Sequence, residues 1–303
     1  MTGKGAFESL QRVAANDLDK PDGSVVYTQL CNEKGGIEAD LTIVRLSAEH
    51  FYVVTGSGFA VRDGHWLRQN GVELKEITSS RAVINVQGPR SRELLSRVSE
   101  SDLSFPYLAA REIRVGYAPV LALRVTYVGE LGWELHVPSE YALHLYETIW
   151  EAGQDLGVAK AGYRALDSLR LEKGYRYWSS ELSPDTNPYE VGLGFAVALE
   201  KGDFIGRDAL RRAKGNVKRK LACFLMDGFV PLHGGEAILH EGKVIETVTS
   251  GGYGHTIQKS IAYGFVPVGK TGKFEIDSFG KRYPAAVSER APYDPERRKI
   301  VNC

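Results

Sequence analysis

The sequence predicts an α+β protein in which the balance of strands and helices changes along the chain. Residues 24–55 form three short apolar runs separated by turns, a pattern typical of antiparallel hairpins. Residues 80–173 mix strand alternation with helical periodicity, and beyond about residue 212 short strands with glycine turns replace the helices. We therefore expect two domains, 1–211 and 212–303, the second of them all-β.

The elements of the first domain follow from hydrophobic spacing and turn residues. The expected strands are 24–31, 37–46, 50–55, 81–87, 111–115, 119–128 and 133–137. The expected helices are one at 6–13, one that ends at residue 98, one at 139–152 and one at 162–173. Ser139 is placed to cap its helix, and Gly174 to end the next one. The side chains expected to face inward on these two helices are Leu143, Tyr146, Ile149 and Trp150, and then Ala165, Leu166 and Leu169.

The second domain is predicted to begin near residues 211–217. Its expected strands are 220–226, 236–239, 243–250, 261–266 and 273–276. Residues 264–271 match the letters of a phosphate-binding loop, but a strand pattern follows where such a loop needs the start of a helix. Pro267 also removes a backbone N–H from the loop. We therefore expect no nucleotide hydrolysis, and the chain also lacks the Gly-x-Gly-x-x-Gly signature of a dinucleotide-binding domain.

Composition and charge exclude several classes of function. The 38 basic and 38 acidic residues cancel, so no overall field attracts nucleic acid or an anionic membrane. No apolar run reaches the roughly 20 residues of a membrane span, and no signal-peptide core is expected. The cysteines Cys31, Cys223 and Cys303 and the seven histidines are scattered, so we expect neither a disulfide framework nor a metal site. The expected location is the cytoplasm, or the mitochondrial matrix in a eukaryote.

A first group of polar residues surrounds Asp40. Strand alternation places Glu38, Asp40 and Thr42 on one face and apolar side chains on the other. A carboxylate that follows a glycine turn in a mostly apolar strand can face a cavity, where partial desolvation raises its pKa and suits it to proton transfer. The residues alone are also consistent with the solvated face of an edge strand, and favour that interpretation.

A second group lies around a glycine turn at residues 129–132. Glu134 follows this turn, where the glycines allow a ligand or a backbone to approach closely. A carboxylate can accept two parallel N–H bonds from a planar amino-heterocycle, and Tyr127 supplies a ring and a hydroxyl at the other end of the turn. The alternative interpretation is an ordinary hairpin with an aromatic cross-strand pair.

A third group begins at Arg164, in the first turn of the predicted helix 162–173. A cation there is unfavourable with the helix dipole, so we expect an acidic partner or an anionic ligand to hold it. A surface pair between Arg164 and Asp167, three residues later, is an equally good interpretation.

Together these groups resemble the folate-binding domain of the glycine-cleavage T-protein, or aminomethyltransferase, family. The resemblance is greatest to the folate-binding half of dimethylglycine oxidase and of the sarcosine and dimethylglycine dehydrogenases. The segments that carry it follow the family order over nearly the whole chain: 35–42, 127–134, 165–176, 191–195, 204–210 and 249–254. Their joint occurrence by chance is remote, although each segment alone is a weak signal.

The resemblance implies three lobes around a central folate cavity. These are an antiparallel β lobe, a ferredoxin-like α/β lobe at about 81–157, and a C-terminal β-barrel at 212–303, with residues 1–211 forming the aminomethyltransferase-like domain. The resemblance also implies roles for single residues. Asp40 matches the essential aspartate beside the reactive nitrogens of tetrahydrofolate, and Glu134 matches the glutamate that grips the pterin. Tyr127 matches a tyrosine of that pocket, Arg164 a folate-site arginine, and Thr42 shares the strand face of Asp40.

The activity implied by the resemblance is the transfer of a one-carbon unit to tetrahydrofolate. A methylene unit from an N-methyl or aminomethyl donor would give 5,10-methylenetetrahydrofolate, whereas direct transfer from an O-, N- or S-methyl donor would give 5-methyltetrahydrofolate. A non-catalytic folate-binding, regulatory or assembly subunit is the alternative. The sequence departs from the family in lacking its usual N-terminal segment, so we expect a strand edge of the β lobe to be left open. It also lacks a fused flavin domain, so we expect a flavoprotein oxidase or dehydrogenase to act as partner.

Overall fold

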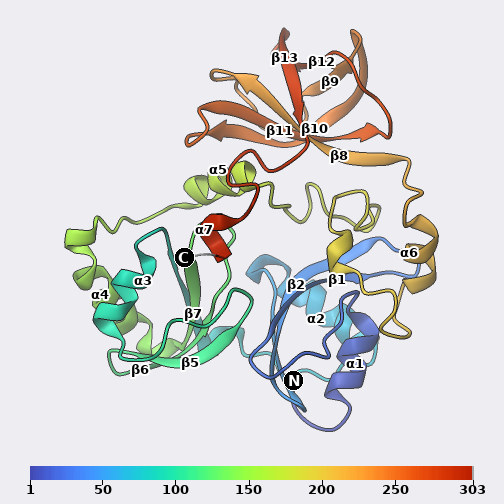
Figure 1. Cartoon of the computed structure of the whole chain (residues 1–303). Coiled ribbons are helices and arrows are strands. Elements are labelled where there is room, and N and C mark those ends of the chain that lie inside the picture. Colours follow the sequence, from blue (N-terminus) through green and yellow to red (C-terminus); the bar gives the residue numbers. More distant parts are fainter. Residues whose placement is uncertain (302–303) are drawn as a thin grey trace.

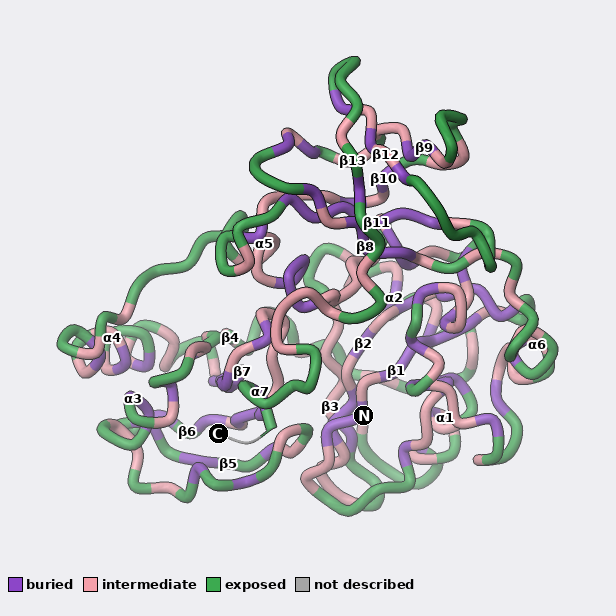
Figure 2. The backbone as a smooth tube through the Cα atoms, turned by 45° about the horizontal axis from the view of Figure 1, so that its top comes forward, coloured by how far each residue is buried: buried purple, intermediate pink, exposed green. Residues whose placement is uncertain are grey.

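The structure, a computed structural model, describes residues 1–301 and has three lobes (Figure 1). An N-terminal three-stranded sheet and a four-stranded α/β lobe lie side by side, and a closed six-stranded barrel sits across both of them. This arrangement confirms the predicted three-lobed α+β fold. Buried residues follow the strands of all three lobes, whereas exposed residues gather on the outer turns (Figure 2).

One face of the three-stranded sheet in the first lobe packs against a hydrophobic core, and the other face points away from that core. Its elements are α1 (Ala6–Val13), β1 (Val25–Cys31), β2 (Ile37–Ser47), β3 (His50–Val54) and α2 (Ala60–Gln69). Leu41 and Ile43 of β2 pack with Leu10 of α1 and Leu67 of α2 in one core cluster. Since neighbouring residues of a strand point to opposite faces, this packing turns Asp40 away from that core.

The second lobe is an antiparallel sheet with the strand order β4-β7-β6-β5. Its elements are β4 (Arg81–Gln87), α3 (Ser91–Val98), β5 (Ala110–Val115), β6 (Ala118–Leu123), β7 (Gly132–Pro138) and α4 (Ala142–Ala152). The predicted strand 119–128 is too long, because β6 ends at Leu123. The N–H of Val125 donates to the carbonyl of Leu123 over 3.0 Å, and this tight turn bends the chain out of the sheet.

The predictions for α4 need correction. The helix follows a short 3₁₀ turn, Ser139–Tyr141, and the Ser139 hydroxyl donates to Ser79 O instead of capping it. Because the helix begins three residues late, Leu145 and Ile149 face the sheet. Leu143 is 67% exposed, and the expected inward positions of Tyr146 and Trp150 become a stacked pair of rings on the outer side.

The barrel closes in the order β10-β11-β8-β13-β12-β9. Its strands are β8 (Arg219–Asp227), β9 (Ala237–His240), β10 (Lys243–Gly254), β11 (Lys259–Pro267), β12 (Phe274–Ser278) and β13 (Lys281–Ser288). The sequence did not predict β13, because Ala285 is its one buried side chain and Pro284 interrupts its donors. Lys270 and Thr271 lie in the turn between β11 and β12, so no helix follows the phosphate-loop letters.

Two helical segments connect the lobes. α5 (Tyr163–Lys173) ends at Gly174 as predicted, with a φ of 73°, and α6 (Arg207–Ala213) leads into β8. After β13 the C-terminal segment 289–301, which includes α7 (Arg298–Val301), returns to the α/β lobe (Figure 1). There the Tyr293 hydroxyl donates to Glu130 Oε1 over 2.6 Å.

Three sequence expectations concern cysteines, metals and membranes. Cys31 and Cys223 are buried free thiols, and burial raises their pKa to about 12 and about 11, whereas Cys303 lies outside the described residues. Within residues 1–301 no cluster of three His, Cys, Asp or Glu side chains could hold a metal ion. In the same part of the chain no helix has the length and apolar character needed to cross a bilayer.

Candidate functional site

Asp40 lies on β2 directly opposite Gln29 of β1. The Gln29 Nε2–H donates to Asp40 Oδ1 over 2.9 Å. Burial raises the pKa of Asp40 to about 6, while the Gln29 amide and the Tyr27 hydroxyl oppose the rise and the nearby charge of Asp63 adds to it. The Asp40 side chain is therefore partly shielded from water, unlike the solvated edge that the residues alone favoured.

Arg62, the cation in the neighbourhood of Asp40, already forms ion pairs with two other carboxylates. Asp63 of α2 is 3% exposed and accepts a hydrogen bond from the Thr55 hydroxyl. Arg62 lies 3.3 Å from Asp63 and donates to Glu38 Oε2 over 2.6 Å. Among residues 1–301 no cation forms an ion pair with Asp40, so its carboxylate remains available to a ligand.

Tyr127 lies in the turn after β6 and is largely fixed by its neighbours. Its hydroxyl donates to the carbonyl of Arg176 over 2.7 Å, and its ring stacks on that of Tyr175 at 5.9 Å. Burial raises the pKa of Tyr127, and the negative charge of Asp40 contributes to the rise. Tyr127 and Asp40 are therefore near enough to share one site, with the Tyr127 ring offering a flat apolar surface.

Glu134 is linked to the first lobe by contacts through His136 and Tyr52. His136 Nε2 lies 3.4 Å from Glu134 Oε2, and His136 Nδ1 lies 3.1 Å from the Tyr52 hydroxyl of β3. A neutral histidine with its proton on Nε2 satisfies both contacts, donating to Glu134 and accepting from Tyr52. The sequence reasoning missed His136, although its place two residues after Glu134 puts both side chains on one strand face.

A cavity of about 310 Å³ lies between β3 and α2 on one side and β4 and β7 on the other. Its walls include Tyr52, Asp63, Arg81 and His136. The five predicted site residues do not line it, but it borders the site through two of their neighbours: His136 contacts Glu134, and Asp63 acts on Asp40. The cavity thus touches a neighbour of each candidate carboxylate, while its wall at Leu41 belongs to the face of β2 opposite Asp40.

The remaining two predicted residues differ in their position. Thr42 lies on the Asp40 face of β2, opposite Tyr27 and Val54. Arg164 is exposed in the first turn of α5 and forms no ion pair within the described part of the chain. The expected Arg164–Asp167 pair is wrong, because Asp167 binds Arg170 at 2.7 Å instead.

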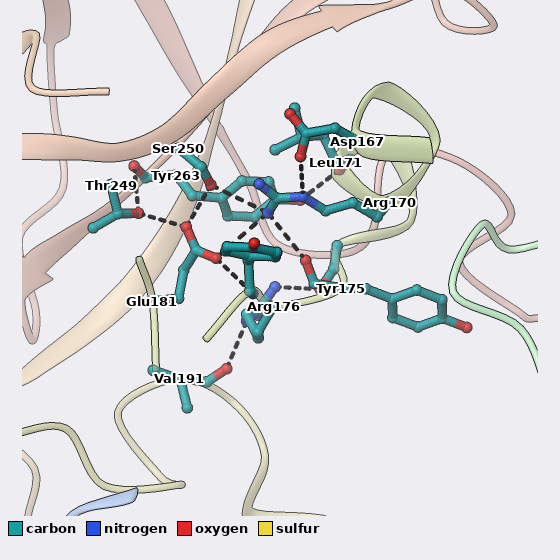
Figure 3. Close-up of polar contacts among 12 residues, drawn as sticks. Asp167, Arg170, Leu171, Tyr175, Arg176, Glu181, Val191, Thr249, Ser250 and Tyr263 are labelled. Carbon is teal, nitrogen blue, oxygen red and sulfur yellow. Dashed lines mark hydrogen bonds and ion pairs between the residues drawn. The ribbon is translucent and has the colours of Figure 1, made fainter. Parts of the chain in front are cut away.

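The buried end of α5 is polar, which corrects the prediction that Ala165, Leu166 and Leu169 form its buried face. Arg170, Leu171, Glu172 and Lys173 are the buried residues, and Ala165 is exposed. Arg170 Nη1 lies 3.4 Å from Glu181 Oε2 and 3.2 Å from Ser250 Oγ of β10 (Figure 3). This ion pair ties α5 and the loop that holds Tyr127 to the barrel, so it supports the site without belonging to it.

The fold has three lobes, and the candidate carboxylates Asp40 and Glu134 come from strands of two of them. Residues 1–201 match the GCVT N-terminal domain, and residues 219–294 match the glycine cleavage T-protein C-terminal barrel domain. The chain therefore belongs to the glycine-cleavage T-protein family, whose aminomethyltransferases are folate-dependent.

Relatives and one solved structure agree with this assignment. An aminomethyltransferase of Thermoanaerobacter sp. is 36% identical, over 87% of this chain and 74% of that protein. The crystal structure of glycine cleavage system aminomethyltransferase T from Bartonella henselae matches with a TM-score of 0.87 and 26% identity, over 97% of this chain and 83% of that one.

Longer relatives confirm the predicted likeness to the sarcosine and dimethylglycine dehydrogenases. Human dimethylglycine dehydrogenase is 38% identical over 94% of this chain. The mouse pyruvate dehydrogenase phosphatase regulatory subunit is 36% identical over an equal share. The chain spans only about a third of the length of these longer relatives, between 34% and 36%.

Proposed function

We propose that this chain transfers a one-carbon unit to tetrahydrofolate, with Asp40 as the proton-accepting group. The observation that carries the proposal is the enclosed carboxylate of Asp40, whose pKa of about 6 leaves it mostly ionised at neutral pH yet close enough to accept a proton. The family membership supports folate as the acceptor.

The residues present fit a pterin. Glu134 of β7 and Asp40 of β2 offer carboxylate oxygens from two different lobes, and Tyr127, after β6, offers an aromatic ring. Glu134 would accept paired N–H bonds from the heterocycle, Tyr127 would pack against it, and Thr42 would lie beside it. When bound, tetrahydrofolate supplies the nucleophilic nitrogens that receive the carbon.

In this mechanism Asp40 orients a nitrogen and takes its proton while the new carbon–nitrogen bond forms. General-base assistance of this kind contributes a factor of about 10² to 10⁴ in rate. Holding donor and acceptor together in the enclosed site adds a further advantage from proximity. Arg164, exposed on α5, would act from the rim, where it could meet an anionic part of the ligand.

The proposed donor is an N-methyl or aminomethyl compound, and the proposed product is 5,10-methylenetetrahydrofolate. The support is the likeness to dehydrogenases named for sarcosine and dimethylglycine, both N-methylated amines. A flavoprotein oxidase or dehydrogenase would generate the one-carbon unit. Direct methyl transfer to give 5-methyltetrahydrofolate is the variant, and product analysis by mass spectrometry separates the two.

The first test compares folate binding and turnover in Asp40→Asn. We expect turnover to fall by about 10² or more while the dissociation constant for tetrahydrofolate changes little. Asp203→Asn, at an exposed position, is the matched control. Undiminished turnover in Asp40→Asn would show that the mechanism is wrong.

The second test concerns the grip on the pterin. Glu134→Gln keeps the shape of the side chain but removes its charge, so tetrahydrofolate should bind more weakly by about tenfold. Isothermal titration calorimetry measures this change directly. An unchanged affinity would remove Glu134 from the site.

A second candidate is a folate-binding or regulatory subunit without catalysis, and the mouse regulatory-subunit relative favours it. The retained carboxylate at Asp40 argues for catalysis, since a purely regulatory protein has no need of a base there. Calorimetric titration and a turnover assay of the wild-type protein together decide between them: binding of reduced folate without turnover would favour a folate-binding subunit, and failure to bind would favour the regulatory role.

A further inference from the structure

Gln29 is a fully buried amide whose side chain donates a hydrogen bond to Asp40. It stands opposite Asp40 in the β1–β2 register, and its Nε2–H donates to Oδ1. Its own carbonyl accepts a hydrogen bond from the N–H of Ala15 over 2.9 Å, which fixes the backbone. The Oε1 atom is buried and has no hydrogen-bond partner within residues 1–301. A buried amide that leaves one atom unsatisfied requires an explanation, because such an atom destabilises the fold.

The groups that face Asp40 come from several elements, and their charges decide what Gln29 contributes. Tyr27 on β1 is a neutral donor, Asp63 on α2 is an anion, and Tyr127 after β6 is a neutral ring within electrostatic reach. With no cation paired to the carboxylate among the described residues, the ionised form of Asp40 depends on neutral donors. Gln29 is the donor with a well-defined hydrogen bond, 2.9 Å from its Nε2 to Asp40 Oδ1.

We propose that Gln29 is a positioning residue for Asp40: its amide holds Oδ1, keeps the carboxylate ionised at neutral pH, and leaves Oδ2 as the oxygen that accepts the proton. The part of this inference that concerns turnover rests on the proposed function. The part that concerns the charge of Asp40 is a property of the folded chain alone. The proton passes from the ligand nitrogen to Oδ2, so the carboxylate becomes a carboxylic acid. Oδ1 keeps its hydrogen bond to the Gln29 amide throughout.

The choice of an amide at this position has a chemical reason. A lysine or arginine in place of Gln29 would pair with Asp40 and make it a weak base. An apolar side chain would leave only the Tyr27 hydroxyl to oppose the effect of burial, and the carboxyl would then hold its proton to higher pH. A neutral donor gives the intermediate condition in which Asp40 is both ionised and basic.

Gln29→Met tests the inference, because methionine has a similar length but no donor. The titration of Asp40, followed through aspartate carboxyl ¹³C signals, should move to higher pH by about 1 to 2 pH units. Gln87→Met is the matched control: Gln87 also donates through Nε2, to Val125 O over 3.2 Å, and also has a buried Oε1 without a partner. An Asp40 midpoint that is the same in Gln29→Met and Gln87→Met would overturn the proposal.

A measurement on the wild-type protein guards against misfolding of the variant. The side-chain amide signals of Gln29 should titrate with the same midpoint as the Asp40 carboxyl, since the two groups share a hydrogen bond. Amide signals that do not respond to the ionisation of Asp40 would also overturn the proposal.

Turnover supplies the last readout. In Gln29→Met the acid limb of the kcat/KM profile should move by the same 1 to 2 pH units, with tetrahydrofolate affinity within about twofold. In an Asp40→Asn background the same change should have no further effect on rate, and an equal additional loss there would refute a role through Asp40. If no variant turns over folate, the proposed function fails, while the two titrations still decide the role of Gln29.

Discussion

Removing the charge of Asp40 should make the protein more stable at neutral pH. Burial raises the pKa of this carboxyl from its ordinary value of 3.8 to about 6, so the folded protein resists its ionisation. Asp40→Asn keeps nearly the same shape and still presents an oxygen to Gln29. The variant therefore removes the energetic penalty of a buried charge without opening a cavity.

The magnitude follows from the size of the shift. A rise from 3.8 to about 6 corresponds to about 3 kcal/mol, at 1.36 kcal/mol for each unit. Below about pH 3 the group is protonated in both folded and unfolded chains, so wild type and variant should be equally stable. As the pH rises towards 6, the unfolded chain ionises first, and the wild type becomes progressively less stable than the variant. Above pH 7 the variant should be more stable by about 3 kcal/mol.

Urea unfolding of both proteins between pH 4 and pH 8 measures this difference. Asp203→Asn, an exposed carboxylate, is the control and should follow the wild type throughout. A stability difference that does not depend on pH, or a variant less stable than the wild type at pH 7.5, would refute the reasoning. Taken with the turnover test, the expected result is a protein that gains stability as it loses activity.

Two further predictions concern contacts between lobes. Arg170→Met leaves Glu181 buried without its cation, so the free energy of unfolding should fall by about 3 to 5 kcal/mol in urea titrations; a fall below about 1 kcal/mol would show that the pair contributes little. Gly36→Ala would place its Cβ 1.8 Å from the carbonyl oxygen of Pro184, and should lower the melting temperature clearly, whereas Gly58→Ala, with no atom within 4 Å, should leave it nearly unchanged.

Local patterns in the sequence predict the elements and the face of Asp40, because both depend on residues that are close along the chain. The alternation through β2 puts Leu41 in the core and Asp40 opposite to it, as the structure shows. The glycine end of α5 is equally local. On α4 the prediction that Ile149 faces inward is confirmed, but a three-residue turn precedes the helix, and Leu145 replaces Leu143 on the buried side.

Contacts between distant segments could not be predicted in this way. The partner of His136 is Tyr52, on another lobe and 84 positions earlier in the chain. Arg170 looked like an ordinary helix residue, yet it is buried because the barrel packs against the end of α5 and supplies Ser250. The position of Arg164 in the first turn of the helix suggests a functional arginine. That turn is exposed, and hydrophobic spacing gives no information about what an exposed side chain contacts.

The C-terminal segment 289–301 changes how the three lobes are connected. The backbone alone would join them in a row, from the first sheet to the α/β lobe and then to the barrel. Lys173 Nζ binds Asp294 Oδ2 at 2.7 Å and Tyr293 binds Glu130, so the end of the barrel is fastened back onto the middle of the chain. The barrel and the α/β lobe are then joined at a second place, so these two lobes cannot separate on a single hinge. Exchange of a large ligand then requires either passage through a fixed opening or release of this fastening, a local unfolding step that hydrogen exchange at residues 289–301 would detect.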